Sequence, residues 1–359
     1  MKICLLGDTH FGARNDHTAF HNHFEKFYSE TLFPYLEENG IDTIVQFGDL
    51  FDRRKYINFL TLYRSREFFF EPAKSKGIDV HVFVGNHDTF YKNTNEINSP
   101  QLLLGEYDNV KTYSKHQEVI FDDLKIALIP WICADNEQEI IKFVKETQAQ
   151  ILFGHLELKG FEMDRGVYSD HGMDSTIFDK FDIVCSGHYH HKSTRGNIHY
   201  LGTPYELTWA DYDDPRGFFI FDTETRDLKF IKNPFTIFKM IDYDDRNKDM
   251  DEVLDVYFEE YTDNYVKVVV KNKTNPYWFD LFINKLEVAG AIDIQVIGDY
   301  VNLHITDEDI ASEAEDTLTI LRKAVGTVEA GVEQNDLDSF LTNLYTEALY
   351  VEWLHNDSF

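Results

Sequence analysis

The first half of the sequence repeats one pattern of hydrophobic and polar positions. Short apolar runs rich in β-branched residues end at a glycine or proline, and longer amphipathic stretches separate several of them. Helical spacing of the apolar positions occurs at 17–39, 59–76 and 137–147. Strands that alternate with amphipathic helices predict an α/β fold. The predicted strands are 2–7, 43–48, 80–85, 125–130, 150–154 and 183–187.

The pattern changes further along the chain. Two more strands are predicted at 198–201 and 217–222, the second in a hairpin with 228–232. Beyond residue 235 a strand, a helix and a strand are predicted at 265–271, 277–290 and 292–297, which would form a small βαβ-like unit. We therefore expect three parts: a first domain at 1–234, a small α/β capping domain at 235–302, and C-terminal helices at 303–359.

The last part of the chain combines negative charge with an apolar helical pattern. Residues 307–324 read as an acidic amphipathic helix, and 336–355 as a helix that is apolar on more than one side. Such a helix either packs on its own domain or docks on a partner, and both options stay open. The candidate docking residues are Leu337, Phe340, Leu341, Leu344, Tyr345 and Trp353.

Composition and charge narrow the function. The 359 residues include 15% aromatics, enough for a large core, and the net charge is −30. Residues 301–359 carry 13 acidic and two basic side chains. This balance argues against a protein that holds nucleic acid by bulk electrostatics alone. It does not exclude a nucleic-acid enzyme whose bound metals or basic partner supply the attraction.

Cysteines and hydropathy indicate the compartment. Cys4, Cys133 and Cys185 form no zinc-binding spacing and lie in or beside apolar runs, so buried free thiols are expected. No stretch approaches the ~18–20 apolar residues that span a bilayer. We expect a soluble, cytoplasmic protein without a membrane partner; if the chain is phage-encoded, the compartment is the host cytoplasm.

Side chains with metal-binding chemistry follow five of the predicted strands. In open α/β sheets, ligands bind outside the carboxyl ends of the strands, so these side chains should converge. Any one of them alone, such as His155, is more often a core or surface residue than a ligand. The ordered set is more specific, and 13 of the 15 histidines precede residue 204. The set comprises Asp8 and His10, Asp49 and Asp52, Asn86 and His87, His155, and His188 and His190.

Carboxylate, amide and imidazole groups suit Mn²⁺, Fe²⁺ or Zn²⁺, and no thiol joins the set. Seven ligands of these kinds suffice for two ions if one carboxylate bridges the ions, and the set of nine side chains provides that number. Two neighbouring metals form the clamp that serves in-line displacement at phosphorus. The residues thus predict a dinuclear phosphoesterase site.

The motifs Asp-x-His, Gly-Asp-x-x-Asp, Gly-Asn-His-Asp, Gly-His and Gly-His-x-His, in this order, resemble the calcineurin-like metallophosphoesterase superfamily over about residues 1–205. The resemblance implies a four-layer sandwich of two mixed β-sheets flanked by helices, with two metals. It assigns Asp49 to both metals as the bridge. The first metal would also bind Asp8, His10 and His190, and the second Asn86, His155 and His188.

The resemblance also implies roles beside the metals. His87 would face the phosphate, stabilise the developing charge and protonate the leaving oxygen, which suits a side chain with a pKa near neutrality. Asp52 would orient His87, with a helix N-cap as its alternative role. Asp88 would hold the loop.

Within the superfamily the chain is similar to the SbcD/Mre-type DNA-repair nucleases, above all to their small, acidic phage-type members. Gly-Asn-His-Asp at 85–88 and Gly-Thr-Pro at 202–204 fit this branch, whereas phosphoprotein phosphatases carry Gly-Asn-His-Glu. The resemblance implies a manganese-dependent exonuclease on double strands and endonuclease on single strands. It also implies an SMC-like (Rad-fifty/SbcC-type) ATPase that binds the C-terminal helices.

The same resemblance implies a homodimer formed by helices of the first domain. The candidates are 59–76, with Phe68, Phe69 and Phe70, and 17–39; packing on the sheet is the alternative. Basic side chains near the motifs are candidate DNA contacts, with ordinary solvated charge as the alternative. They are Arg14, Arg53, Arg54, Lys55, Arg195 and Arg216.

Two other functions compete with the nuclease. A cyclic-nucleotide or small-molecule phosphodiesterase of the same superfamily would need neither the cap nor the apolar tail. A non-enzymatic scaffold of the same fold would have lost metal ligands, and here every ligand position is filled.

Overall fold

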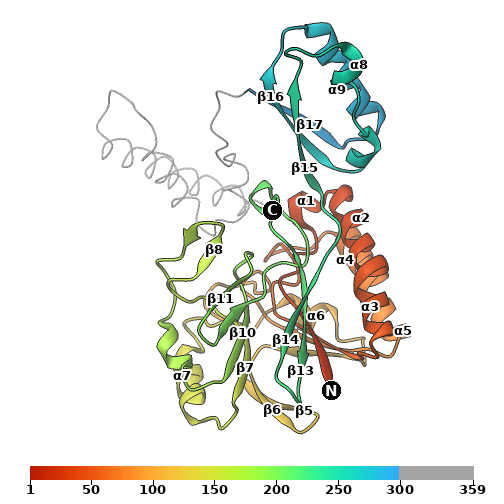
Figure 1. Cartoon of the computed structure of the whole chain (residues 1–359). Coiled ribbons are helices and arrows are strands. Elements are labelled where there is room, and N and C mark those ends of the chain that lie inside the picture. The colour runs from red at the N-terminus through yellow and green to blue at the C-terminus, as the bar shows by residue number, and fades with distance from the viewer. Residues whose placement is uncertain (299–359) are drawn as a thin grey trace, which may run out of the picture. The chain divides into compact units, whose positions relative to one another are not determined.

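Two six-stranded β-sheets form the centre of the computed structural model, which describes residues 1–298 (Figure 1). In the first sheet β1 lies parallel to β2 and antiparallel to β13. In the second sheet β7 lies parallel to β10, whereas β5 and β6 are antiparallel. Both sheets are therefore mixed, as predicted.

The strand order of the first sheet is β14 (Leu228–Lys232), β13 (Gly217–Asp222), β1 (Lys2–Leu6), β2 (Thr43–Gln46), β3 (Asp79–Phe83) and β4 (Val110–Tyr113). The order of the second is β11 (Ser193–Arg195), β12 (Ile198–Tyr200), β10 (Ile183–Gly187), β7 (Ile151–His155), β6 (Leu124–Ile129) and β5 (Gln117–Phe121). A separate hairpin pairs β8 (Glu162–Asp164) with β9 (Val167–Tyr168).

Alternating side chains on the strands build three cores between four layers. On β1, Ile3 and Leu5 enter the core between the two sheets, whereas Cys4 and Leu6 enter the core under the helices of the first sheet. This split follows from the two-residue period of a strand. A third core lies between the second sheet and α7 (Glu137–Glu146). The predicted four-layer sandwich is confirmed.

Two long helical stretches cover the first sheet, and each contains one π-helical turn. The first runs through α2 (Thr18–Phe27), a wide turn at Tyr28–Leu32 and α3 (Phe33–Glu38). The second runs through α4 (Phe59–Ser65), a wide turn at Arg66–Phe70 and α5 (Glu71–Ser75). Each wide turn lies just before a proline that has no N–H to donate, so the turn accommodates the missing bond of the α-helix; the prolines are Pro34 and Pro72.

The aromatic run Phe68–Phe70 lies inside this structure. All three rings are at most 5% exposed and belong to the core under the first sheet's helices. The prediction that this run forms a dimer contact is therefore wrong, and its alternative, packing on the sheet, is confirmed. All three rings lie within the wide turn and face the core.

Four short helical segments complete this part of the chain. They are α1 (Ala13–Asp16), which has left-handed backbone angles at Arg14 and Asn15, α6 (Ser99–Leu103), and 3₁₀ turns at Ser175–Phe178 and Trp209–Asp211.

Residues 238–298 form a smaller sheet with its own core. Three parallel strands lie in the order β15 (Phe238–Asp244), β16 (Tyr265–Asn272) and β17 (Asp293–Gly298), and α9 (Pro276–Val288) connects the last two. A short α8 (Met250–Val253) and a 3₁₀ turn at Phe258–Tyr261 precede β16. The predicted strand–helix–strand unit is present, and β15 adds a strand that the sequence pattern did not reveal. The bounds of the three predicted domains stay predictions.

A buried carboxylate joins the smaller sheet to the rest of residues 1–298. Glu206 is 2% exposed and accepts hydrogen bonds from the backbone N–H groups of Ile237, at 2.7 Å, and Phe238, at 3.0 Å. Burial raises the pKa of Glu206 to about 7 despite these two donors. The folded protein therefore binds a proton here more tightly than the unfolded chain does.

We expect Glu206→Gln to flatten the pH dependence of stability. The pKa of Glu206 is higher in the folded protein than in the unfolded chain. Its contribution to the free energy of unfolding is therefore fully present below about pH 4.5 and is lost as the pH rises through about 7. Glutamine keeps an acceptor oxygen without titrating. Urea unfolding at pH 5 and pH 8 should show the wild type losing on the order of 3 kcal/mol more than the variant. Parallel losses in both proteins would contradict the assignment.

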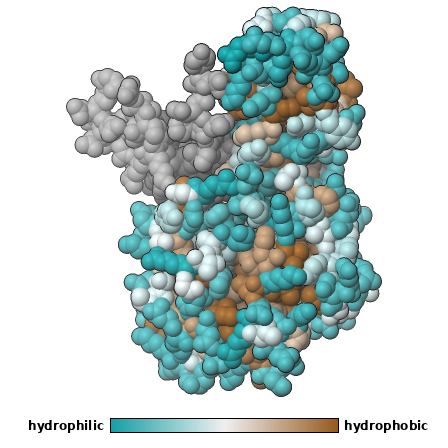
Figure 2. Space-filling model, viewed as in Figure 1, coloured by the Kyte–Doolittle hydropathy of each residue, from teal (hydrophilic) through white to brown (hydrophobic). Residues whose placement is uncertain are grey.

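Figure 2 shows a mostly hydrophilic face, with apolar side chains gathered near β13 and β14. The three cysteines are buried and free, as expected. Among the described residues, no helix has both the length and the apolar character to cross a membrane. The predicted helices 307–324 and 336–355, with their docking residues, lie outside the described residues.

Candidate metal centre

The candidate ligands come from the carboxyl ends of five strands in two different sheets. Asp8 and His10 follow β1, Asp49 follows β2, and Asn86 follows β3. His155 ends β7, and His188 and His190 follow β10. Most of these side chains are buried, and the structure brings all seven together in two clusters.

The first cluster holds Asp8, His10 and His190. One ligand atom from each lies within 4.8 Å of the others. The Nε2 atoms of His10 and His190 are 3.0 Å apart. Two imidazole nitrogens that face each other beside a carboxylate form a suitable setting for a cation.

The second cluster holds Asp49, His155 and His188, with Asn86 between the rings. Asn86 Oδ1 lies 2.8 Å from His155 Nε2 and 2.9 Å from His188 Nδ1. Asp49 Oδ2 lies 3.5 Å from His155 Nε2 and 3.9 Å from His10 Nε2 of the first cluster. The same oxygen of Asp49 thus lies within 4 Å of metal-binding nitrogens in both clusters.

Glycines make the close approach of the loops possible. Gly48 has a φ of +96°, and a Cβ added there would lie 2.6 Å from His155 Nδ1. A Cβ on Gly187 would lie 2.4 Å from Asp8 Oδ1. His10, Asp49 and His188 adopt positive φ although they carry side chains. Backbone strain of this kind persists only where the surroundings impose it, as in functional sites.

Asp88 ties two of the loops together. Its carboxylate accepts hydrogen bonds from Leu50 N and Gly85 N, at 3.0 and 2.9 Å, and from Phe51 N at 3.3 Å. Burial raises the pKa of Asp88 to about 6. Asp88 therefore holds the loop of Asp49 against the loop of Asn86 and His87.

Burial and charge tune the histidines differently. Burial, aided by His155, holds the pKa of His188 well below its usual range, so this ring is neutral, the form that ligates a metal. Burial also lowers the pKa of His155, but the Asp49 carboxylate outweighs it and raises the value to about 9. A metal at His155 therefore competes with a proton and binds less tightly as the pH falls.

His87 lies beside the clusters and is oriented by backbone atoms. Its Nδ1 is 2.6 Å from the main-chain oxygen of Asp52, and its own N–H donates to Asp49 Oδ1 at 2.7 Å. The Asp52 carboxylate instead lies 3.3 Å from His10 Nδ1. The predicted orienting residue is thus adjacent to His87, but its side chain contacts His10. Asn58, not Asp52, caps the next helix.

The donor set fits divalent cations on two observations. Two carboxylates, an amide oxygen and four imidazoles offer hard-to-borderline ligands in two clusters. Asp8 Oδ1 is buried and accepts no hydrogen bond from any side chain or backbone group within residues 1–298. A buried carboxylate oxygen without a donor costs free energy, which a bound cation would offset.

Trp131 is a site residue that sequence reasoning missed. Its ring centroid lies 5.2 Å from that of His188 and 5.9 Å from that of His155. It follows β6, so the rule that placed the candidate ligands at strand ends also indicates this position. Its apolar side chain gave no chemical signal.

The predicted DNA-contacting cations have different surroundings. Arg53 contacts Tyr56 and Asn15, and Arg195 donates to Gly160 O at 3.2 Å. Arg14 and Arg54 also have interaction partners. These four stay predictions. Arg216, in contrast, is only 5% exposed and lies in an ion cluster, so it is neither a DNA contact nor a solvated charge.

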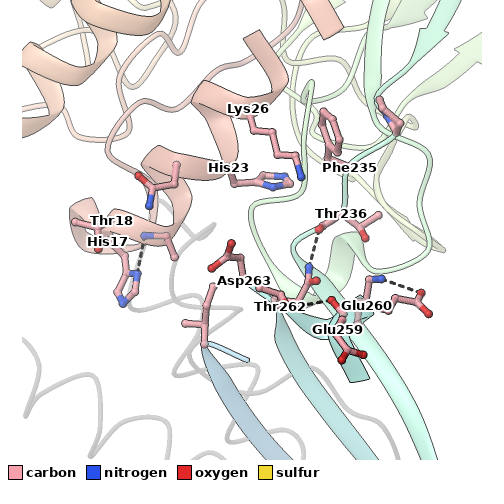
Figure 3. A pocket seen from close by; sticks show the side chains of 16 residues that line it. His17, Thr18, His23, Lys26, Phe235, Thr236, Glu259, Glu260, Thr262 and Asp263 are labelled. Atoms are coloured by element: carbon pink, nitrogen blue, oxygen red, sulfur yellow. Dashed lines mark hydrogen bonds and ion pairs between the residues drawn. The ribbon is translucent and has the colours of Figure 1, made fainter. Parts of the chain in front are cut away.

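A groove of about 600 Å³ lies between α2 and the segments near Phe235 and Glu260 (Figure 3). Charged groups of both signs line it, including Lys26, Glu259 and Asp263. It contains none of the seven candidate ligands, so the clusters at the strand ends remain the candidate centre.

Comparisons with known proteins agree with this geometry. The family described as calcineurin-like phosphoesterase matches residues 1–192. Exonuclease subunit 1 of Enterobacteria phage T4 is 34% identical over 356 residues, 98% of this chain and 99% of the phage protein. The DNA double-strand break repair protein Mre11 of Sulfurisphaera tokodaii is 26% identical over 196 residues, 53% of this chain and 49% of that protein.

Among solved structures, a novel archaeal phosphodiesterase superposes on this chain with a TM-score of 0.33 at 12% identity. The match covers 65% of this chain and 99% of that one, and a TM-score this low supports no argument. The family match covers more than half of the chain, and the phage relative covers nearly all of it. Together with the His and Asp clusters, they confirm the predicted family and enzyme class. The chain belongs to the calcineurin-like phosphoesterase family and is a metal-dependent phosphoester hydrolase.

Proposed function

We propose that the chain is a manganese-dependent DNA nuclease that acts in recombination, double-strand-break repair and recombination-dependent replication. The observation that carries the proposal is the pair of clusters joined by Asp49, together with the nearly full-length likeness to a phage exonuclease subunit. Both double-strand exonuclease and single-strand endonuclease activity are part of the proposal. A phage relative also favours the host cytoplasm as its compartment.

The seven candidate ligands divide between two ions. Asp49 would contribute to both, and the two ions would neutralise phosphate charge and activate a water for attack. Oxygen and imidazole donors without thiols are compatible with Mn²⁺. The first ion would take Asp8, His10 and His190, and the second Asn86, His155 and His188.

His87 supplies the acid in this proposal. A carbonyl oxygen can only accept, so the contact with Asp52 O puts a proton on Nδ1 of His87. A second proton, when bound, then lies on Nε2, which is free of that contact. Burial lowers the pKa of His87, but Asp49 and the Asp52 carbonyl outweigh it and raise the pKa. His87 can therefore donate a proton to the leaving oxygen. Asp52 acts through its backbone on His87 and through its carboxylate on His10.

The other parts of the chain would supply substrate and partners. We propose residues 1–234 as the nuclease domain, 235–302 as a cap that contacts DNA, and 303–359 as the segment that binds an SMC-like ATPase. Arg14, Arg53, Arg54 and Arg195 are the proposed phosphate contacts. With a net charge of −30, tight DNA binding by this chain alone is not expected.

An exposed apolar surface supports a homodimer. Phe59 is 89% exposed, Tyr63 61% and Leu102 72%. Phe59 and Leu102 line one groove of about 230 Å³, so α4 and α6 form one surface. Large exposed apolar side chains that cluster are typical of protein interfaces. We propose that a second copy of the chain covers them.

We expect Phe59→Glu to dissociate this dimer, because a charge would be buried without a partner. Sedimentation should give a wild-type mass of twice 42.1 kDa and a variant mass of 42.1 kDa. Tyr257→Glu, at an aromatic side chain that is 72% exposed on another part of the chain, is the matched control and should stay dimeric. A monomeric wild type would sink the proposal.

The nuclease proposal is tested by cleavage of end-labelled linear duplex and circular single-stranded DNA with Mn²⁺, Mg²⁺ or EDTA. Cleavage with Mn²⁺ that EDTA abolishes is expected. Hydrolysis of bis(p-nitrophenyl) phosphate without any cutting of DNA, with the ATPase partner also present, would favour the small-molecule phosphodiesterase instead.

A further inference from the structure

A buried ion cluster contacts the backbone of His190, the last of the seven candidate ligands along the chain. Arg216 is paired with Asp211 and with Asp214, the latter at 2.9 Å, and the three side chains are at most 5% exposed. Ordinary surface pairs on this chain, such as Arg226 with Asp182, are far more open. Burying charged groups costs free energy. A cluster as buried as this one therefore indicates a role that surface ion pairs do not have.

The guanidinium is the hub of this cluster. Its Nη1 donates to the main-chain oxygen of His190 and, at 2.8 Å, to Thr203 Oγ1. The His190 oxygen also accepts from Thr203 N at 3.1 Å. A Cβ on Gly202 would lie 2.7 Å from the same oxygen, which shows how tightly the two segments pack. The backbone of His190 is therefore fixed by residues 202–216.

The carboxylates extend the cluster on both sides. Asp214 also contacts His191 Nδ1 at 2.8 Å, so it holds the residue that follows His190. Asp211 accepts from Leu207 N at 2.7 Å and Thr208 N at 3.0 Å, which anchors the cluster to a capped turn.

The second ligand cluster is anchored by other groups. His155 Nδ1 lies 2.7 Å from Phe47 O, and the N–H of His188 donates to Asp8 Oδ2 at 2.8 Å. The Arg216 contacts therefore reach the first ligand cluster, through His190, and not these two rings.

We infer that Arg216, with Asp214, is a positioning residue for the first metal: it fixes the His190 backbone so that the His190 ring faces His10. The inference rests on the metal assignment proposed above. A guanidinium suits this task because its planar fork serves two carboxylates, a carbonyl and a hydroxyl together. A lysine ammonium in its place would keep the charge but not all four contacts.

The test is a Mn²⁺ titration of the full-length apoprotein. Electron paramagnetic resonance measures the free Mn²⁺ at each step of the titration. The wild type should bind two ions. In Arg216→Met one ion should bind about 10- to 100-fold more weakly, the loss typical of groups that orient metal ligands, while the other binds normally. Arg216→Lys should recover part of the affinity. Arg226→Met, which removes a surface ion pair, should bind both ions like the wild type.

Each result decides a separate question. A wild type that binds fewer than two ions would refute the dinuclear site itself. Two unchanged affinities in folded Arg216→Met would overturn the positioning role alone, as would equal weakening of both ions, which marks a general loss of structure. If Arg216→Met does not fold, Asp214→Asn takes its place, because it keeps the Asp211 pair; the same selective loss is expected, and unchanged affinities overturn the inference.

Discussion

Asp49→Asn should abolish phosphodiester hydrolysis and the binding of both metals. Asp49 Oδ2 lies within reach of both clusters, at 3.5 Å from His155 Nε2 and 3.9 Å from His10 Nε2. Metals contribute several kcal/mol to stabilising phosphoryl transfer, so we expect a loss of at least about 10³-fold in kcat. Metal content after dialysis and the rate with bis(p-nitrophenyl) phosphate measure the two effects.

The control for this variant is Asp108→Asn. Asp108 is an exposed aspartate that pairs with Lys74 on the surface, so its amide should leave metal content and rate unchanged. Two tightly bound ions in Asp49→Asn would show that Asp49 is not the shared ligand.

His87→Ala should separate chemistry from metal binding. The backbone N–H of His87 donates to Asp49, and alanine retains this contact. The His87 ring contacts the main-chain oxygen of Asp52 through Nδ1. The variant should therefore keep both ions and the wild-type fold while kcat falls about 10²- to 10⁴-fold, the usual contribution of a general acid. Substrates with a good leaving group, such as p-nitrophenolate, should lose less, because they need little protonation.

That difference between substrates tests whether His87 protonates the leaving oxygen. DNA, whose leaving oxygen is poor, should show the larger loss in His87→Ala. His171→Ala, at a histidine that is 80% exposed, serves as the control and should be neutral. Loss of metal from His87→Ala would assign the ring a structural role in the centre and remove it from the chemistry.

Much of the fold could be predicted because its signals are local. The apolar run at 183–187 and the hairpin of 217–222 with 228–232 match strands in the structure. β15 was missed because its Phe-Lys-Met-Ile-Asp-Tyr-Asp pattern carries charges on both faces, and its partner β16 is distant in sequence. The wide turns before Pro34 and Pro72 do not change the helical spacing of the apolar positions, so the sequence does not reveal them. The run Phe68–Phe70 could therefore be interpreted as a dimer contact although its rings are buried.

The candidate site was predictable where chemistry and position coincide. Asp8, Asn86 and His188 each combine a ligating side chain with the end of a predicted strand, and the structure gathers them. Which way Asp52 points depends on the loop that carries it, and the burial of Arg216 depends on two aspartates that fold over it. These facts are tertiary, and no spacing in the chain encodes them.

The origin of the ligands has a consequence for cohesion of the whole sandwich. Each cluster takes residues from both sheets: His10 with His190 in one, and Asp49 with His155 in the other. An ion in either cluster would therefore act as a crosslink between two sheets that otherwise adhere through a hydrophobic interface. By mass action, metal at 100 times its dissociation constant adds ~2.7 kcal/mol per independent site to the stability of the sandwich. The concentration of the divalent cation would then set the stability of this fold as well as its rate of hydrolysis.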